Sequence, residues 1–200
     1  MSTSTRTRLR PDQRRSQLVD LGVRLLATRS LDELSIDLLA EEAGISRGLL
    51  YHYFGGKQAF HEAVVRRAAD DLIEQTAPPG HGDPLEQLAA SMTAYVDYVV
   101  ANRAGYLSLV RAAQGGNETL RAIYDDARSA LTDRIFTEDA GGALVEDTPA
   151  VRLLVRGWAA LAEEVVVTWV TDPAGVSRDE LLAILSASLP ALVEAISAPS

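Results

Sequence analysis

The stretch from residue 35 to residue 57, SIDLLAEEAGISRGLLYHYFGGK, most constrains how this chain can fold. It contains two helix-forming segments that are each too short to be stable alone. Ser35 and Ser46 precede the two segments as N-cap residues, and Gly44 suits the left-handed position just past the first. The pattern predicts a helix-turn-helix over about residues 35–54, which must pack against neighbouring helices.

The inner positions of this stretch fit two helices that cross steeply. Ala40 is small enough to let the helices approach, and Ile45 and Leu50 can fill the wedge between them. Leu49 and Phe54 are expected to face the interior as well.

The rest of the chain also reads as helix, because apolar residues recur at helical spacing and strand-like alternation is not evident. Further helices are expected over about residues 11–29, 57–75, 84–100, 106–113, 118–137, 149–171 and 177–197. Residues 77–84, APPGHGDP, form the clearest interruption, a second loop surrounds Gly141 and Gly142, and Pro190 predicts a kink in the last helix. The predicted fold class is therefore all-α.

Charge is distributed unevenly along the chain, whose net charge is −9. Residues 1–57 carry nine basic and seven acidic side chains, whereas residues 58–200 carry ten basic and twenty-one acidic side chains. Five arginines precede residue 16 and face one acid, Asp12. Such a basic arm is either an electrostatic footprint for nucleic acid or a solubilising tail.

Several classes of site and location are disfavoured by composition. The chain has no cysteine, which excludes disulfides and thiolate metal sites, and its three histidines are too scattered to suggest zinc. No cofactor motif is present. No apolar run approaches the roughly 18 to 20 residues that span a bilayer, and the first 15 residues lack a signal-peptide core. The expected location is the cytoplasm.

The second helix of the helix-turn-helix carries side chains suited to DNA. Arg47, in its first turn, could contact a guanine edge bidentately, and the hydroxyl groups of Tyr51 and Tyr53 can donate to phosphate oxygens. Gly48 would let the backbone lie close to a groove, and Lys57 could hold a phosphate at the start of the next helix. The alternative is a small helical subdomain whose aromatic residues are only core.

The chain resembles the tetracycline-repressor (TetR) family of transcriptional regulators over about residues 12–60. The motifs that carry the resemblance are LSIDLLAEEAGIS at residues 34–46 and G-x-L-Y-x-Y-F-x-x-K at residues 48–57. It implies an N-terminal three-helix helix-turn-helix DNA-binding domain and a larger C-terminal helical domain for ligand binding and dimerisation. The corresponding expected divisions are a flexible basic arm at 1–11, a DNA-binding domain at 12–57 and a C-terminal domain at 58–200.

The resemblance also implies which residues contact DNA. These are Ser35, Ser46, Arg47, Gly48, Tyr51, His52, Tyr53 and Lys57. Asp37 departs from the family pattern, because many members place a base- or phosphate-contacting residue there. A carboxylate would repel phosphate but could accept a hydrogen bond from a cytosine amino group.

Two features of the C-terminal half bear on dimerisation and ligand binding. The helices at 149–171 and 177–197 have broad apolar stripes, which either form a two-fold four-helix interface or fill the subunit's own core. Aromatic and polar residues of the middle helices predict a cavity for a small, largely apolar ligand, unless the aromatics are ordinary core. The candidate ligand-binding residues are Tyr95, Tyr98, Tyr106, Arg111, Gln114, Tyr124 and Trp158.

Three functions are therefore compared. The first is a homodimeric repressor that binds a palindromic operator and is released or modulated by a small molecule. The second is a DNA-binding regulator without a small ligand, controlled by a protein partner or by its own abundance. The third is an enzyme, for which the chain offers no phosphate-binding loop, nucleophile elbow or Ser/His/Asp grouping; Glu163 and Glu164 are expected to be solvated.

Overall fold

The computed structural model describes residues 10–137 and 144–197. Over those residues the chain forms nine α-helices, one short 3-10 helix and no strand, so the all-α prediction is confirmed. The predicted loop around Gly141 and Gly142, and residues 1–9 of the predicted arm, lie outside the described residues. No helix in the described part of the chain is long and apolar enough to cross a membrane.

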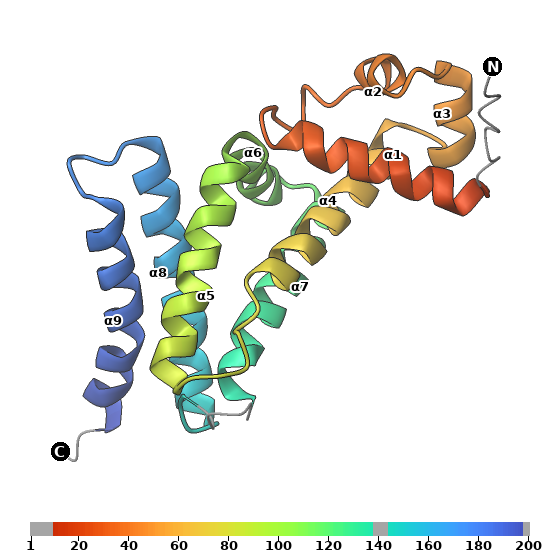
Figure 1. Cartoon of the computed structure of the whole chain (residues 1–200). Coiled ribbons are helices and arrows are strands. Elements are labelled where there is room, and N and C mark those ends of the chain that lie inside the picture. The colour runs from red at the N-terminus through yellow and green to blue at the C-terminus, as the bar shows by residue number, and fades with distance from the viewer. Residues whose placement is uncertain (1–9, 138–143, 198–200) are drawn as a thin grey trace, which may run out of the picture.

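The first three helices form one end of the molecule (Figure 1). They are α1 (Pro11–Leu26), α2 (Ile36–Ala43) and α3 (Arg47–Phe54). Their core is formed by fully buried Leu18, Leu34, Leu39 and Leu50, and α4 (Lys57–Gln75) contributes Phe60 to it. Leu50 and Ala40 are buried between α2 and α3, as predicted for a steep crossing of two short helices.

The same core extends into the second half of the chain. Leu120 and Ile123 of α7 (Glu118–Asp133) belong to it, and α4 runs from the N-terminal helices towards the other end of the molecule (Figure 1). Burial of α4 and α7 side chains in one cluster joins the N-terminal helices to the C-terminal half through packed side chains.

A second core lies among α5 (Pro84–Ala101), α8 (Pro149–Thr171) and α9 (Arg178–Ser197). Val96, Val155, Val166, Leu185 and Leu189 are completely buried there. The helices α8 and α9 lie side by side at the edge opposite the N-terminal end (Figure 1). The helix α6 (Arg103–Gln114) packs on α7, and the 3-10 helix Arg134–Phe136 follows α7.

Three predicted helix ends differ from the observed ones, each for a local reason. The first helix ends at Leu26 rather than 29, because the chain leaves it to bury Leu31, whose N–H donates to Ser108 Oγ at 2.9 Å. The sixth begins at Arg103, directly after α5, with Asn102 joining the two. The seventh ends at Asp133, where it tightens into the 3-10 turn.

Candidate DNA-binding surface and ligand cavity

The helix-turn-helix is held by three capping interactions that the sequence predicts. Ser35 Oγ accepts from Leu38 N at 3.0 Å and Ser46 Oγ accepts from Leu49 N at 3.3 Å, so each serine caps a helix. Gly44 has φ 64° and ψ 37°, which is the left-handed conformation that favours glycine. These local bonds fix the angle at which α3 leaves the turn.

The outward side of α3 carries the predicted DNA-contacting groups. Arg47, Gly48, Tyr51 and His52 are exposed, and Tyr51 keeps 52 % of its surface in solvent despite its aromatic ring. A Cβ at Gly48 would meet no atom within 4 Å, so the helix backbone is uncovered at this point. An exposed helix that presents arginine, tyrosine and histidine can enter a DNA major groove.

Two cations flank this surface. Arg47 Nε lies 2.5 Å from Asp37 Oδ1 of the preceding helix, and both side chains are mostly exposed. Lys57 Nζ lies 3.4 Å from the backbone oxygen of Asp32 and is also exposed. Asp37 therefore holds the guanidinium of Arg47, a contact that the sequence did not predict.

Two side chains of α3 are placed differently from expectation. Leu49 is expected in the interior but is 37 % exposed, because helical spacing turns it away from the face of α3 that Leu50 and Phe54 bury. Tyr53, whose hydroxyl is predicted to donate to a phosphate, is half-buried against the core, with its ring 5.8 Å from that of His52. An eight-residue helix has only one buried face, and Leu50 and Phe54 occupy it.

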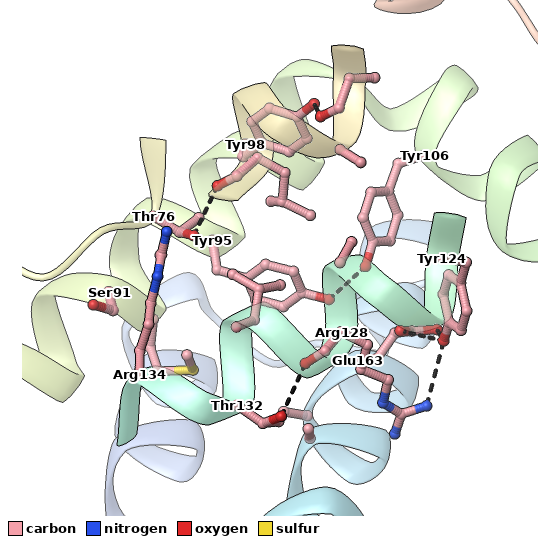
Figure 2. Close-up of a pocket in the computed structure, with 18 of the residues that line it drawn as sticks. Thr76, Ser91, Tyr95, Tyr98, Tyr106, Tyr124, Arg128, Thr132, Arg134 and Glu163 are labelled. Atoms are coloured by element: carbon pink, nitrogen blue, oxygen red, sulfur yellow. Dashed lines mark hydrogen bonds between the residues drawn. The ribbon is translucent and has the colours of Figure 1, made fainter. Parts of the chain in front are cut away.

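A cavity of about 220 Å³ lies among α1 and α4 to α8 (Figure 2). Its walls are mainly apolar side chains from α4, α5, α6, α7 and α8, and Val23 and Leu26 of α1 also line it. An apolar cavity with a few polar groups is typical of a site for a small molecule. Because α1 contributes to its wall, the cavity directly adjoins the helices of the DNA-binding end.

Tyrosine hydroxyls are the main polar groups in the middle of the cavity. Tyr95 and Tyr106 share a hydrogen bond of 2.8 Å between their hydroxyl oxygens, and Figure 2 shows the pair meeting across the space. Burial raises the pKa of both phenols well above the ordinary value, so both remain neutral. Tyr98 is turned to donate to Ala68 O at 2.9 Å, and burial raises its pKa to about 12.

A second polar group lies beside this pair. Tyr124 donates to both carboxylate oxygens of Glu163, at 2.7 and 2.6 Å, and accepts from Arg128 Nη1 at 3.4 Å (Figure 2). Burial first, and then the Glu163 hydrogen bond, raise the pKa of Tyr124 to about 12. Glu163 is half-buried in the cavity wall, so the expectation that it is solvated is wrong.

The candidate ligand-binding residues divide into two groups. Tyr95, Tyr98, Tyr106, Tyr124 and Trp158 line the cavity together. Arg111 and Gln114 do not line it: both are exposed at the end of α6, and Arg111 Nε donates to the backbone of its own helix, Leu107 O, at 3.0 Å.

Sequence reasoning did not identify three charged residues of the cavity wall, Arg128, Arg134 and Glu163. Arg128 lies four residues after Tyr124 on α7, on the same side of the helix, and this spacing was the available signal. Arg134 offered no such signal, because the 3-10 turn after α7 sets its direction.

Comparison with known proteins agrees with this fold. Residues 18–64 match the family model for bacterial regulatory proteins of the tetR family, and residues 84–192 match the tetracyclin repressor-like C-terminal domain. The chain belongs to the TetR family of DNA-binding transcriptional regulators. The family and its relatives are regulators and not enzymes.

Individual relatives cover most of the chain. A solved tetR-family transcriptional regulator from Streptomyces coelicolor is 34 % identical, with a TM-score of 0.78 over 93 % of this chain and 84 % of that one. The HTH-type transcriptional activator FasR of Mycolicibacterium smegmatis is 24 % identical over 86 % of this chain and 79 % of its own. The regulator FadR from Bacillus subtilis, solved in complex with stearoyl-CoA, is 20 % identical with a TM-score of 0.61 over 89 % of this chain and 97 % of that one.

Proposed function

We propose that this protein is a cytoplasmic, homodimeric transcriptional repressor that binds a palindromic operator and is released by a small molecule. The observation that carries the proposal is a capped, outward-facing recognition helix in the same chain as an apolar cavity whose wall includes α1. Binding in the cavity would act on the packing of α1 and hence on the position of α3.

The DNA contacts proposed are those of the helix-turn-helix surface. Arg47 reads a base edge, and the hydroxyl and imidazole groups of the same helix contact the backbone, while Lys57 holds a phosphate. Besides Arg47 and Lys57, the proposed contacts are Ser35, Ser46, Gly48, Tyr51, His52 and Tyr53. The basic arm, residues 1–11, adds phosphate attraction to the DNA-binding domain at 12–57, and residues 58–200 provide dimerisation and ligand binding.

The dimer proposal rests on a second apolar face of α8 and α9. Each helix buries one stripe in its own subunit, through residues such as Val155 and Leu185. Leu153 is nevertheless 74 % exposed, and Leu161, Ile184 and Ile196 are 44, 50 and 50 % exposed. Gly157 has open space where a Cβ would be, which permits close helix approach. A two-fold contact between these faces would cover them.

Ligand control is favoured over control by a protein partner because the cavity carries several neutral phenols among apolar walls. The fold neighbour FadR was solved with stearoyl-CoA, which supports a cavity of this fold holding a small molecule. Activation rather than repression is the second candidate, because the relative FasR is a transcriptional activator.

Binding to the DNA upstream of the protein's own gene tests the proposal. Fluorescence anisotropy is measured against a scrambled duplex at two salt concentrations. Binding to the upstream DNA alone, retained at the higher salt, is expected of a specific regulator. Equal, salt-sensitive binding to both duplexes would contradict recognition of that site. Transcription in a purified system then distinguishes repression, which is expected, from activation.

A further inference from the structure

Arg134 is the residue of the cavity wall whose hydrogen bonding is incomplete. Its Nη1 is buried and has no hydrogen-bond partner, the one such side-chain nitrogen or oxygen among the described residues. Its other terminal nitrogen, Nη2, donates to the backbone oxygen of Ile73 near the end of α4. A buried polar group without a partner costs free energy and calls for an explanation, such as a bound water or ion.

The hydrogen bond to Ile73 accounts for the burial of Nη2 but not for the burial of Nη1. A cation at the end of α4 is favourable for the helix dipole, and Nη2 alone provides that contact. No carboxylate within the described part of the chain lies in ion-pair distance of Arg134. Burial lowers the pKa of Arg134, although an arginine remains protonated at neutral pH. Among the described residues, the charge of Arg134 is therefore without a counter-charge.

The charges of the whole cavity wall also favour a negatively charged ligand. Two guanidinium groups, those of Arg128 and Arg134, and one carboxylate, that of Glu163, line the space. Arg128 and Glu163 lie together around Tyr124, each with its own hydrogen bonds, whereas Arg134 lies apart from them in Figure 2. The excess positive charge is thus concentrated at the Arg134 end.

Apart from the hydroxyls of Tyr95 and Tyr106, the space between these two ends is mainly apolar. Leu72, Leu88, Met92, Leu131 and Ile135 contribute to its walls. The Tyr95–Tyr106 pair holds one hydroxyl hydrogen within itself and leaves the other free to donate, but it carries no charge. A molecule that fills the cavity must therefore be mainly apolar and can satisfy Arg134 only with an acceptor at one end.

We infer that the cavity binds a monocarboxylate with an apolar body, whose carboxylate accepts from Arg134 Nη1 and whose body lies among α4, α5 and α7. This inference rests on the proposed function, because it names the class of ligand for the same cavity. A carboxylate matches a guanidinium in charge and geometry, and burial makes that contact stronger than it would be in water.

The experiment uses three ten-carbon probes that differ only in the head group: decanoate, decanol and decyltrimethylammonium. Binding to the full chain without DNA is followed by the shift in Tm and by calorimetry, at pH 7.5 and below micelle-forming concentrations. Decanoate should bind most tightly. Arg134→Met should weaken decanoate roughly tenfold or more while leaving decanol nearly unchanged, because only the charged contact is lost.

Two further variants guard against trivial explanations. Arg66→Met removes an exposed arginine of α4 and should leave decanoate affinity at the wild-type value. Arg134→Lys keeps the charge and should retain part of the preference for decanoate over decanol. The Tm of each unliganded variant shows whether it is folded. A general loss of structure would lower affinity for decanol as well, so the ratio of the two affinities isolates the head-group contact.

Other results would overturn the inference. Equal affinity for decanoate and decanol, unaffected by Arg134→Met, would mean that Arg134 only caps α4. Preference for decyltrimethylammonium, lost in Glu163→Gln, would assign a cationic ligand to the other end. No binding of any probe would exclude an amphiphile of this class. Wild-type binding to its operator is measured separately, so failure of the regulator function is distinguished from failure of this ligand assignment.

Discussion

At the scale of single residues, Asp37 is the unexpected component of the DNA-binding surface. Its carboxylate lies 2.5 Å from Arg47 Nε, which leaves the terminal nitrogens of the guanidinium available to a base edge. An exposed ion pair contributes only about 0–1 kcal/mol to folding, so its value for stability is small. We expect the ion pair to act mainly by holding the side chain of Arg47 in one orientation.

Asp37→Asn should therefore lower specificity rather than stability. Nonspecific DNA affinity should rise, because a negative charge near the phosphates is removed, while the ratio of operator to scrambled affinity falls. Anisotropy on both duplexes measures the ratio, and urea unfolding should show no large change. An unchanged ratio would mean that Asp37 does not position Arg47.

Arg47 and Lys57 should respond differently to truncation. Arg47→Ala should cost about 1–3 kcal/mol of operator binding and relax the preference at one base-pair position. Lys57→Ala should weaken all sequences alike and reduce the salt slope by about one unit. Affinity measured on single-base operator variants across a salt series separates the two. Unchanged operator affinity in Arg47→Ala would place the recognition helix elsewhere.

At the scale of secondary-structure elements, the contact between α1 and α6 links the cavity to the DNA-binding end. A Cβ at Gly105 would lie 2.5 Å from Leu26 O, which is backbone and cannot turn aside. Ser108 of the same helix accepts the N–H of Leu31. Both contacts fix α6 against the end of α1, while Tyr106 between them faces the cavity.

Gly105→Ala should lower the free energy of unfolding by about 1–3 kcal/mol, since the methyl group forces the two helices apart. Urea denaturation measures it. Gly48→Ala is the matched control: its methyl group meets open space, and alanine should stabilise α3 by about 0.5–1 kcal/mol. If Gly48 lies against DNA, that variant nonetheless binds the operator less tightly. A Gly105→Ala protein as stable as the wild type would contradict the close packing.

At the scale of the whole molecule, the outer face of α8 and α9 exposes several large apolar side chains. The exposed Leu153, Leu161 and Ile184 lie on two helices that already bury a full inner stripe. One apolar face therefore fills the subunit core and a second remains uncovered. The helices can thus both fill the core of their own subunit and form an interface.

Leu153→Glu combined with Ile184→Glu should convert the proposed dimer to a monomer, because charge within an apolar interface is costly to bury. Light scattering should give a mass near the single-chain value of 21.5 kDa instead of twice that value. Leu85→Glu, at a 53 % exposed leucine of α5, should leave the mass unchanged. A wild-type protein that is itself monomeric would refute the proposed interface.

Local chemistry explains why much of the architecture could be read from the sequence. Ser35, Gly44 and Ser46 act through bonds to residues at most four positions away, so their capping roles follow from neighbours alone. Proline at the first helical position and apolar spacing of three to four residues set most helix bounds in the same way. The sequence therefore determined the helices, their order and the helix-turn-helix.

Only the tertiary structure decided which side chains meet across helices. Arg47 and Asp37 lie on different helices, and so do Tyr124 and Glu163, whose contact bridges 39 positions of sequence. Arg111 and Arg134 are both arginines near the ends of helices, yet one is exposed and the other lines the cavity. Helical periodicity fixes a side chain's direction relative to its own axis, whereas the rotation and packing of whole helices decide which neighbour it faces.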